Sequence, residues 1–217
     1  GTPGIRMGTH AEYICMPETG VMAEKPAEMT FSQASAYPLA GNTALFFIRD
    51  LGGIQAGQNI LIHGASGAIG TFAVQLAKYY GAQVTGVCST ANVELVKSLG
   101  ADRVIDYTKE DFTKGKERYD IIFGVVGKSR FSQCKVLLKP KGIYLENWLE
   151  LKDLLSMMWT SIIPGKRIKG GVSKESVENL NFFIELFKTG KVKPVIDRSY
   201  PLEQTAEAFK YVEKGHK

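Results

Sequence analysis

One stretch decides the fold expected of this chain: Leu61-Ile62-His63-Gly64-Ala65-Ser66-Gly67-Ala68-Ile69-Gly70. It joins a short apolar run to an amphipathic helical stripe, and its small residues follow the pattern Ala-x-Gly-x-x-Gly. In a dinucleotide-binding turn, Gly67 lets the backbone approach a pyrophosphate and Gly70 lets the helix pack closely against the strand. The N–H groups and the dipole at the helix start then bind the negative charge. A tight strand–helix turn without a ligand is the alternative.

Outward from this stretch, strand-like and helix-like apolar patterns alternate along the chain. Strands are expected at 59–62, 83–87, 103–105, 119–123 and 142–145, with a further edge strand at 167–169. Helices are expected at 44–51, 69–80, 93–99, 129–138 and 173–188. Strands that alternate with helices of this length form βαβ units. The sequence therefore predicts an α/β fold of Rossmann type, a doubly wound parallel sheet with helices on both faces.

The two ends of the chain have a different pattern. Short strands are expected at 11–16 and 21–23, separated by a turn at 17–20. Two such strands cannot bury a face of their own, so they are interpreted as the remnant of a β domain. The expected organisation is a remnant at 1–27, a dinucleotide-binding domain at 28–192 and a truncated return segment at 193–217.

Composition excludes several classes of protein. The 217 residues are 44% hydrophobic and carry 27 basic and 22 acidic side chains, for a net charge of +5. No apolar run reaches the roughly 18 residues of a membrane span, and the lysines are scattered among acids rather than clustered as in a nucleic-acid footprint. Three widely separated cysteines, Cys15, Cys88 and Cys134, do not form a disulfide framework. A reducing, cytoplasmic location is expected.

The end of the second expected strand bears on the choice of cofactor. NAD-binding proteins place an acid about 20 residues beyond the glycine pattern, where it grips the ribose 2′-hydroxyl. Here Cys88 to Asn92 contain no carboxylate, and the next acid is Glu94. Small hydroxyl and amide side chains leave room for a 2′-phosphate, so NADPH is expected in preference to NADH.

Residues from about 11 to 217 resemble the zinc-independent quinone oxidoreductase branch of the medium-chain dehydrogenase/reductase superfamily. The matching stretches are 41–44 (GNTA), 64–70 (GASGAIG), 98–102 (SLGAD), 104–107 (VIDY) and 193–196 (KPVI). The resemblance implies a GroES-like β-barrel, of which the two ends would be remnants, paired with a Rossmann domain. It also implies NADPH binding, the reduction of quinones or α,β-unsaturated carbonyls, and a homodimer paired edge to edge near 167–169.

The resemblance also implies positions for the cofactor. The expected contacts are Asn42 and Thr43 beside the nicotinamide, Gly67, Ala68 and Ile69 under the pyrophosphate, Ser89, Asn92 and Tyr107 at the adenosine phosphate, and Gly124, Val125 and Val126 after the fourth strand. Helix capping for the first two residues and ordinary surface packing for Tyr107 are the alternatives. No residue is identified as a catalytic acid.

Two stretches depart from the family pattern at the expected nicotinamide end. Relatives usually carry Asp-x-x-Gly after the fourth strand, where this chain has Gly124-Val125-Val126-Gly127. After the fifth strand, Glu146-Asn147-Trp148 replaces a small glycine-rich turn. We expect the bulkier turn to narrow the cofactor slot.

No metal site is expected, because no cysteine lies at ligand spacing from another cysteine or a histidine. His63 is interpreted as a satisfied core or loop histidine. The tract 154–159 is interpreted as core, with a place in the substrate cleft or a dimer contact as alternatives.

Two other functions compete with this one. A short-chain reductase is rejected, because none of the nine tyrosines is followed four residues later by lysine. A non-catalytic NADPH sensor or interaction module of the same fold stays open. This chain by itself is expected to bind the cofactor with slow or no turnover.

Overall fold

The computed structural model of the chain describes residues 11–127, 129–148, 151–162 and 164–215. These residues form two compact units, one made of 1–42 and 175–217 and the other of 43–174. The domain boundaries expected from the sequence stay a prediction.

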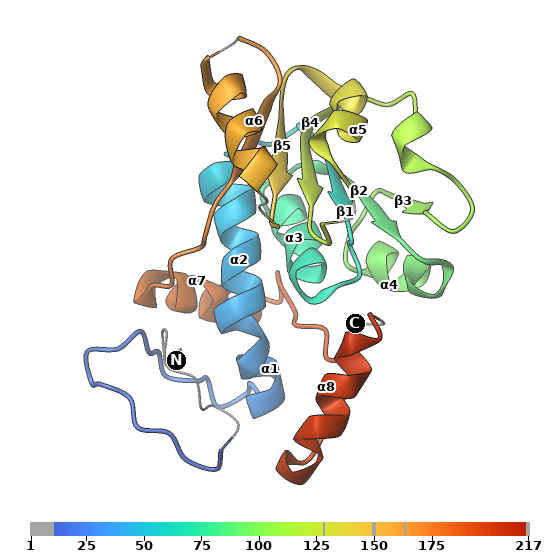
Figure 1. The fold of residues 1–217 in the computed structure, drawn as a ribbon. Coiled ribbons are helices and arrows are strands. Elements are labelled where there is room, and N and C mark those ends of the chain that lie inside the picture. Colours follow the sequence, from blue (N-terminus) through green and yellow to red (C-terminus); the bar gives the residue numbers. More distant parts are fainter. Residues whose placement is uncertain (1–10, 128, 149–150, 163, 216–217) are drawn as a thin grey trace. The chain divides into compact units, whose positions relative to one another are not determined.

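The unit of residues 43–174 contains a six-stranded parallel sheet (Figure 1). Its strands are β1 (Asn59–His63), β2 (Gln83–Cys88), β3 (Arg103–Asp106), β4 (Tyr119–Gly124), β5 (Leu138–Glu146) and β6 (Arg167–Gly170). They lie in the order β3-β2-β1-β4-β5-β6, which is the strand order of the Rossmann fold. The predicted α/β fold and parallel sheet are confirmed, and β6 lies at the edge, as expected.

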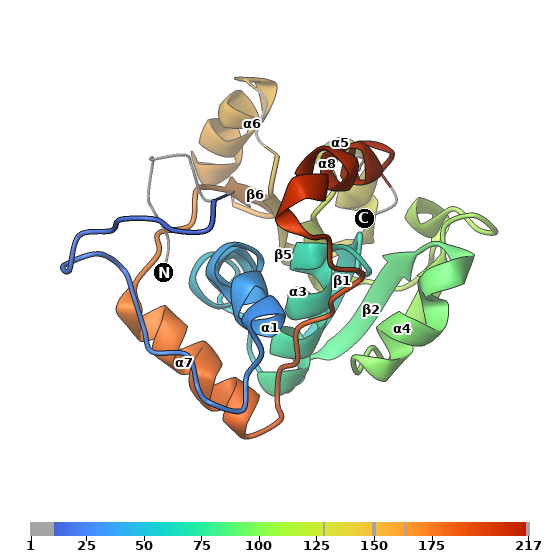
Figure 2. The ribbon, with the colours of Figure 1, turned by 90° about the horizontal axis from the view of Figure 1, so that it is seen from below.

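Helices cover both faces of this sheet. On one face lie α3 (Ala68–Tyr79), α4 (Val93–Ser98) and the irregular helix η2 (Phe46–Leu51). Phe47 of η2 stacks on Phe123 of β4 with ring centroids 4.9 Å apart. Figure 2 shows α3 beside β1 and α4 beside β2, in agreement with their contacts. Residues 60–63 of β1 and 121–124 of β4, the two central strands, are buried as a result.

The other face is covered by α5 (Phe131–Cys134), the 3-10 turn η5 (Lys135–Leu137) and part of α6 (Leu151–Ile162). Its core is a continuous cluster of buried side chains: Leu61, Val87, Ile105, Tyr119, Ile122, Cys134, Leu137, Leu138, Tyr144 and Ile168. Alternate residues of each strand thus supply the two cores, as the two-residue period of a strand requires.

In the unit of residues 1–42 and 175–217, the regular secondary structure of the described residues is helical. It contains α1 (Phe31–Ala36), the π-helical turn η1 (Tyr37–Gly41), α7 (Val177–Lys188), the 3-10 turn η6 (Leu202–Gln204) and α8 (Thr205–Glu213). The Tyr37 and Phe183 rings pack 5.3 Å apart, and Gly41 leaves room for the Phe183 ring. The short helix α2 (Asn42–Leu45) begins at the boundary between the two units.

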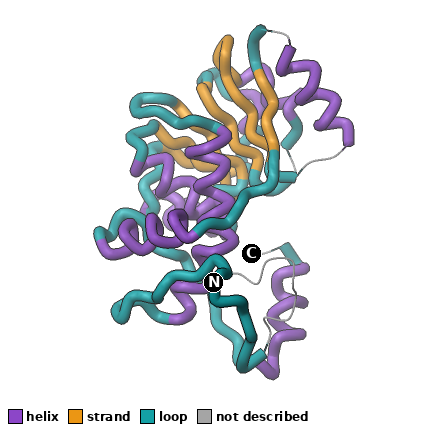
Figure 3. Tube along the Cα trace, turned by 90° about the vertical axis from the view of Figure 1, so that its left-hand side faces the viewer, coloured by secondary structure: helices purple, strands orange, loops and turns teal. Residues whose placement is uncertain are grey.

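The strands expected at 11–16 and 21–23 are wrong. Residues 11–30 are loop and turn throughout (Figure 3), although the Gly20 amide does close the expected turn onto the Pro17 carbonyl at 2.9 Å. A strand exists only where its backbone groups pair with a neighbour, and the described residues give this segment no such partner. The described residues therefore show no barrel remnant at either end, since 193–200 also lack a strand.

Two further expectations need correction. The helix expected at 129–138 is a short α-helix, α5, continued by the 3-10 turn η5, and it ends at Leu137 because Leu138 pairs with Tyr119 as the first residue of β5. The tract 154–159 is helical in α6, but Met158 and Trp159 are 67% and 69% exposed and are not core. The helix packs against the sheet edge with its opposite side, where Met157 reaches the core cluster.

Every helix among the described residues is too short or too polar to cross a lipid bilayer.

The three cysteines are expected to differ sharply in reactivity. Burial raises the pKa of Cys88 to about 11 and that of Cys134 to about 12, whereas Cys15 is exposed. The thiolate is the reactive form, so iodoacetamide at pH 8 should add one label to the folded chain, at Cys15. Mass spectrometry after labelling in denaturant should show three labels. Fast native labelling of Cys134 would contradict the packing of α5 on the sheet.

Candidate functional site: the carboxyl edge of the sheet

The turn between β1 and α3 is built around three glycines. Gly64 has a φ of +90°, a conformation that favours glycine. A Cβ on Gly70 would overlap the Gly64 carbonyl oxygen and come within 2.9 Å of the Ala65 Cα. Gly70 is therefore required by close packing inside the turn, as the sequence predicted.

Gly67 has a different role in the same turn. It is the N-cap of α3 and provides no side-chain cap for the first turn of that helix. A Cβ placed on Gly67 would meet only the Gly64 carbonyl oxygen, at 3.5 Å, so the surface above it is open. The backbone amides at the start of α3, including those of Ala68 and Ile69, thus lie at an uncapped helix terminus that a ligand can approach. This arrangement fits the pyrophosphate of a dinucleotide.

Main-chain hydrogen bonds tie the ends of neighbouring strands together. The Ala65 amide donates to the Val87 carbonyl at 3.1 Å, and the Val125 amide donates to the His63 carbonyl at 3.0 Å. Two further bonds extend the pattern on either side, Tyr107 N to Cys88 O at 3.1 Å and Asn147 N to Gly124 O at 3.3 Å. The predicted residues after β1, β2, β3 and β4 are therefore brought to one edge of one sheet.

The expected adenosine end lies at β2 and β3. Ser89 and Asn92 are half-buried, and the Asn92 amide donates to the Ser89 hydroxyl at 3.1 Å. Tyr107 is 56% exposed beside them. The pair of small polar groups and the ring form an open polar surface at this corner of the sheet.

Asp106, which the sequence did not single out, anchors this corner. Its carboxylate accepts hydrogen bonds from the Thr90 hydroxyl at 2.5 Å and from the Thr108 hydroxyl at 2.7 Å. The hydrogen bonds from Thr90 and Thr108 lower the pKa of Asp106 to about 2. The Lys109 ammonium lies 3.5 Å from the same carboxylate. The structure thus brings a cation to a strand end whose own residues contain none.

At the other end of the site, three residues lie in register across the central strands. His63 of β1 pairs with Gly124 of β4, and Gly124 pairs with Glu146 of β5. A Cβ on Gly124 would come 2.5 Å from the Tyr144 hydroxyl. Gly124 is therefore needed to make room for Tyr144, which explains why the acid of the family pattern is missing at this position.

A buried polar chain fills the space that Gly124 leaves. The Tyr144 hydroxyl donates to the Ser129 carbonyl at 2.8 Å and lies 3.0 Å from the Ser129 hydroxyl. The Ser129 hydroxyl in turn lies 2.9 Å from Nδ1 of His63. Burial raises the pKa of Tyr144 well above its ordinary value. His63 is thus a satisfied buried histidine, as the sequence predicted.

The loops after β4 and β5 contact each other. The Asn147 side-chain amide donates to the Val125 carbonyl at 3.3 Å, and the Trp148 Cβ lies against Gly127. Val126 is 44% exposed and packs over Gly64. The expectation that the Glu146-Asn147-Trp148 turn narrows the cofactor slot stays a prediction.

The two residues expected beside the nicotinamide belong to different units. Thr43 is nearly buried, and its hydroxyl lies 3.4 Å from that of Ser173, in the loop after β6. Asn42 is buried in the other unit, where its side-chain Oδ1 accepts a hydrogen bond from the Asn179 side-chain Nδ2 at 2.7 Å. Their predicted contacts with a cofactor stay predictions.

Among the described residues there is no group of three or more His, Cys, Asp or Glu side chains that could hold a metal ion. Asp106, Ser129 and Ser173 are the polar groups of this edge that sequence reasoning missed. Only Asp106 carried a usable signal, because it stands at the carboxyl end of an expected strand.

A sheet in the order 3-2-1-4-5-6 with an open glycine turn at its switch point defines a dinucleotide-binding protein of Rossmann type. The profile of the zinc-binding dehydrogenase family matches residues 99–217. The chain belongs to this family, within the medium-chain dehydrogenase/reductase superfamily, in the branch of quinone oxidoreductases and alkenal reductases.

Curated relatives match nearly all of the chain. The mouse mitochondrial NAD(P)H oxidoreductase RTN4IP1 is 35% identical over 99% of this chain and 60% of its own length. The tomato (Solanum lycopersicum) 2-methylene-furan-3-one reductase and the chloroplastic NADPH-dependent alkenal/one oxidoreductase of Arabidopsis thaliana are each 34% identical, over 97% of this chain and 51% of their own lengths. The chain thus spans about half to three-fifths of these relatives.

Solved structures agree in fold. The quinone oxidoreductase from Coxiella burnetii superposes with a TM-score of 0.81 at 28% identity, over 90% of this chain and 61% of that one. An NAD-dependent alcohol dehydrogenase superposes with a TM-score of 0.82 at 26% identity, over 97% of this chain and 63% of that one.

Proposed function

We propose that this chain is the cofactor-binding portion of an NADPH-dependent oxidoreductase that reduces quinones or α,β-unsaturated carbonyls by hydride transfer. The observation that carries the proposal is the uncapped start of α3 at Gly67, placed at the carboxyl edge of the sheet. The relatives support the substrate class, since they include quinone, alkenal/one and furanone reductases.

The chain's own residues hold and orient the cofactor in this proposal. Amides at the start of α3 bind the pyrophosphate, Ser89, Asn92 and Tyr107 hold the adenosine phosphate, and Thr43 faces the nicotinamide. When bound, the reduced nicotinamide supplies the hydride, and the protein contributes orientation and the exclusion of water. We expect the chain by itself to bind the cofactor with slow or no turnover.

We expect NADPH to bind at least tenfold more tightly than NADH. The 2′-phosphate would meet the hydroxyl and amide of Ser89 and Asn92 and the nearby Lys109 ammonium, and each hydrogen bond to a charged group is worth about 1.5–3 kcal/mol. Calorimetric titration of this chain with each cofactor measures the difference. Lys109→Ala should reduce NADPH affinity and leave NADH affinity unchanged. Binding of neither cofactor would contradict the proposal and favour a non-catalytic interaction module.

We also propose that two copies of the chain pair through the edge strand β6. In the described part of the sheet, β6 has a strand neighbour on one side only. Beside it, α6 exposes an apolar stripe at helical spacing: Leu155, Met158, Trp159 and Ile162 are 66–77% exposed. An open strand edge next to an apolar patch is a typical contact between subunits.

Light scattering should therefore give about twice the chain mass of 23.8 kDa. Trp159→Glu should shift the protein towards the monomer, because it buries a charge in the contact. Val212→Glu, at another exposed apolar position on α8, is the matched control and should leave the mass unchanged. A wild-type chain that stays monomeric at high micromolar concentration would exclude this mode of pairing.

A further inference from the structure

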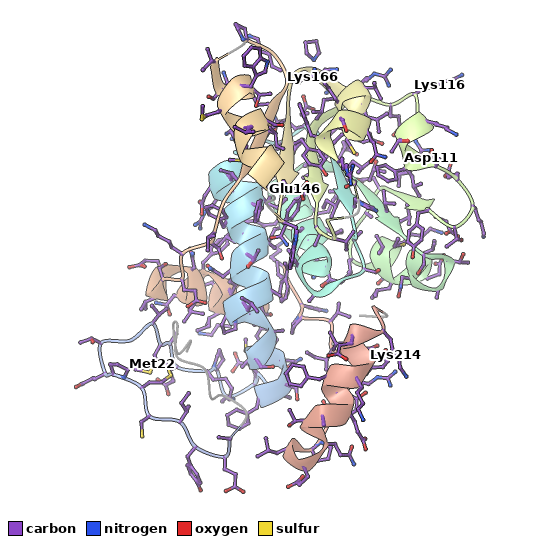
Figure 4. The ribbon with its side chains drawn as sticks, in the orientation of Figure 1. Met22, Asp111, Lys116, Glu146, Lys166 and Lys214 are labelled. Carbon is purple, nitrogen blue, oxygen red and sulfur yellow. The ribbon has the colours of Figure 1, made fainter. Side chains whose placement is uncertain are left out.

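Glu146 is a buried carboxylate at the carboxyl end of β5 (labelled in Figure 4). Only 4% of its surface is exposed. One of its oxygens accepts a hydrogen bond from the Trp148 amide at 3.3 Å. Its negative charge contributes to the raised pKa values of Tyr144 and Cys134, after the larger effect of burial.

In the proposed binding mode, this carboxylate lies in the nicotinamide half of the site. A pyrophosphate at the start of α3 and an adenosine at β2 and β3 direct the nicotinamide towards the ends of β4 and β5. Glu146 lies level with Gly124 and His63, the last residues of β4 and β1. Adjacent strands are about 4.8 Å apart, so Glu146 stands roughly 10 Å from the strand that carries the pyrophosphate turn.

We propose that Glu146 favours the oxidised cofactor over the reduced cofactor at this site, and so makes the bound reduced cofactor a stronger hydride donor. The inference rests on the proposed function. The oxidised nicotinamide ring carries one positive charge, and the reduced ring carries none. A carboxylate near the ring attracts the first and not the second, and burial weakens the screening of that attraction.

The consequence for the reaction follows from linkage. When a site binds NADP⁺ more tightly than NADPH, the equilibrium of the bound pair shifts towards NADP⁺ by the ratio of the two dissociation constants. In this proposal, the negative charge that the family pattern has after β4 is carried by Glu146 at the end of β5. The end of β4 is uncharged, because Gly124 stands there and makes room for Tyr144.

The test compares the Kd of NADP⁺ with the Kd of NADPH, by calorimetry on the wild-type chain and on Glu146→Gln. We expect the variant to shift the ratio about tenfold towards NADPH, because it removes one negative charge at constant shape. Glu146→Asp keeps the charge and should stay within about twofold of the wild type. Glu117→Gln removes an equal charge at the amino end of β4, roughly 20 Å of strand away, and should leave the ratio unchanged.

Adenosine 2′,5′-bisphosphate separates this inference from the proposed function, because it lacks the nicotinamide. Its affinity should be equal in the wild type and Glu146→Gln. If the wild type binds no dinucleotide, the proposed function fails. If both cofactors bind but Glu146→Gln leaves their ratio unchanged, only the present inference fails. Should Glu146→Gln not fold, the wild type decides, since it must bind NADP⁺ more tightly than NADPH, and equal or weaker binding overturns the proposal.

Discussion

Alanine at Gly70 is expected to destabilise the protein by at least about 3 kcal/mol, whereas alanine at Gly67 should cost less than about 1 kcal/mol. The added Cβ at Gly70 overlaps the Gly64 carbonyl oxygen and crowds the Ala65 backbone, and neither can move without opening the turn. The Cβ at Gly67 meets only one atom, at 3.5 Å, and its φ of −75° suits alanine. Urea unfolding followed by circular dichroism measures both changes.

At Gly67, the large expected effect of alanine is on cofactor affinity rather than on stability. Gly67→Ala is expected to stay folded and to lose at least tenfold in NADPH affinity, because its Cβ stands where the pyrophosphate approaches the backbone. A Gly67→Ala protein that binds NADPH like the wild type would place the ligand elsewhere.

The second large effect is expected at Gly124 and Tyr144. Gly124→Ala should lower the free energy of unfolding by about 2–3 kcal/mol, because its Cβ would lie 2.5 Å from the Tyr144 hydroxyl. Tyr144→Phe should cost about 1–3 kcal/mol, because the Ser129 carbonyl loses its buried donor.

The two substitutions should not add. In the Tyr144→Phe background the hydroxyl is gone, so Gly124→Ala should cost clearly less than it does alone. The double-mutant cycle, measured by urea unfolding, isolates this coupling. Additive costs would mean that the glycine does not serve the tyrosine, and the Tyr144 hydroxyl would then not account for the missing acid at position 124.

The fold was predictable from the sequence to the extent that local patterns determine it. Buried strands such as 59–62 and 119–123 are short apolar runs, and the helix after Gly67 has a clear apolar stripe. The alternation of strands with helices could therefore be recognised, and it predicted a parallel sheet. The strands expected at 11–16 and 21–23 failed because apolar alternation describes a strand only when a neighbour is present to pair with it. The tract 154–159 failed because apolar composition does not say which face of a helix meets the sheet.

The candidate site was predictable at the pyrophosphate turn, where backbone geometry demands glycine. It was not predictable at the nicotinamide end. The Tyr144 hydroxyl occupies the space that a side chain at position 124 would need. This relation depends on the register between β4 and β5, which local sequence does not encode. The same holds for Asp106, whose partners Thr90 and Thr108 come from two different turns.

The main-chain bonds that tie the strand ends together have a consequence for how this protein can change over time. Peptide groups join β1 to β2 and β4, and β4 to the residue after β5, in addition to the side-chain bonds of His63, Ser129, Tyr144 and Asn147. Substitutions at exposed strand ends can therefore alter charge and shape without breaking these bonds, whereas packed positions such as Gly124 cannot change freely. Tyr107 is an exposed position of this kind, because it is 56% exposed and its backbone amide donates to the Cys88 carbonyl whatever side chain it carries. New ligand preferences can then be acquired by single substitutions at such positions, with little loss of stability at each step.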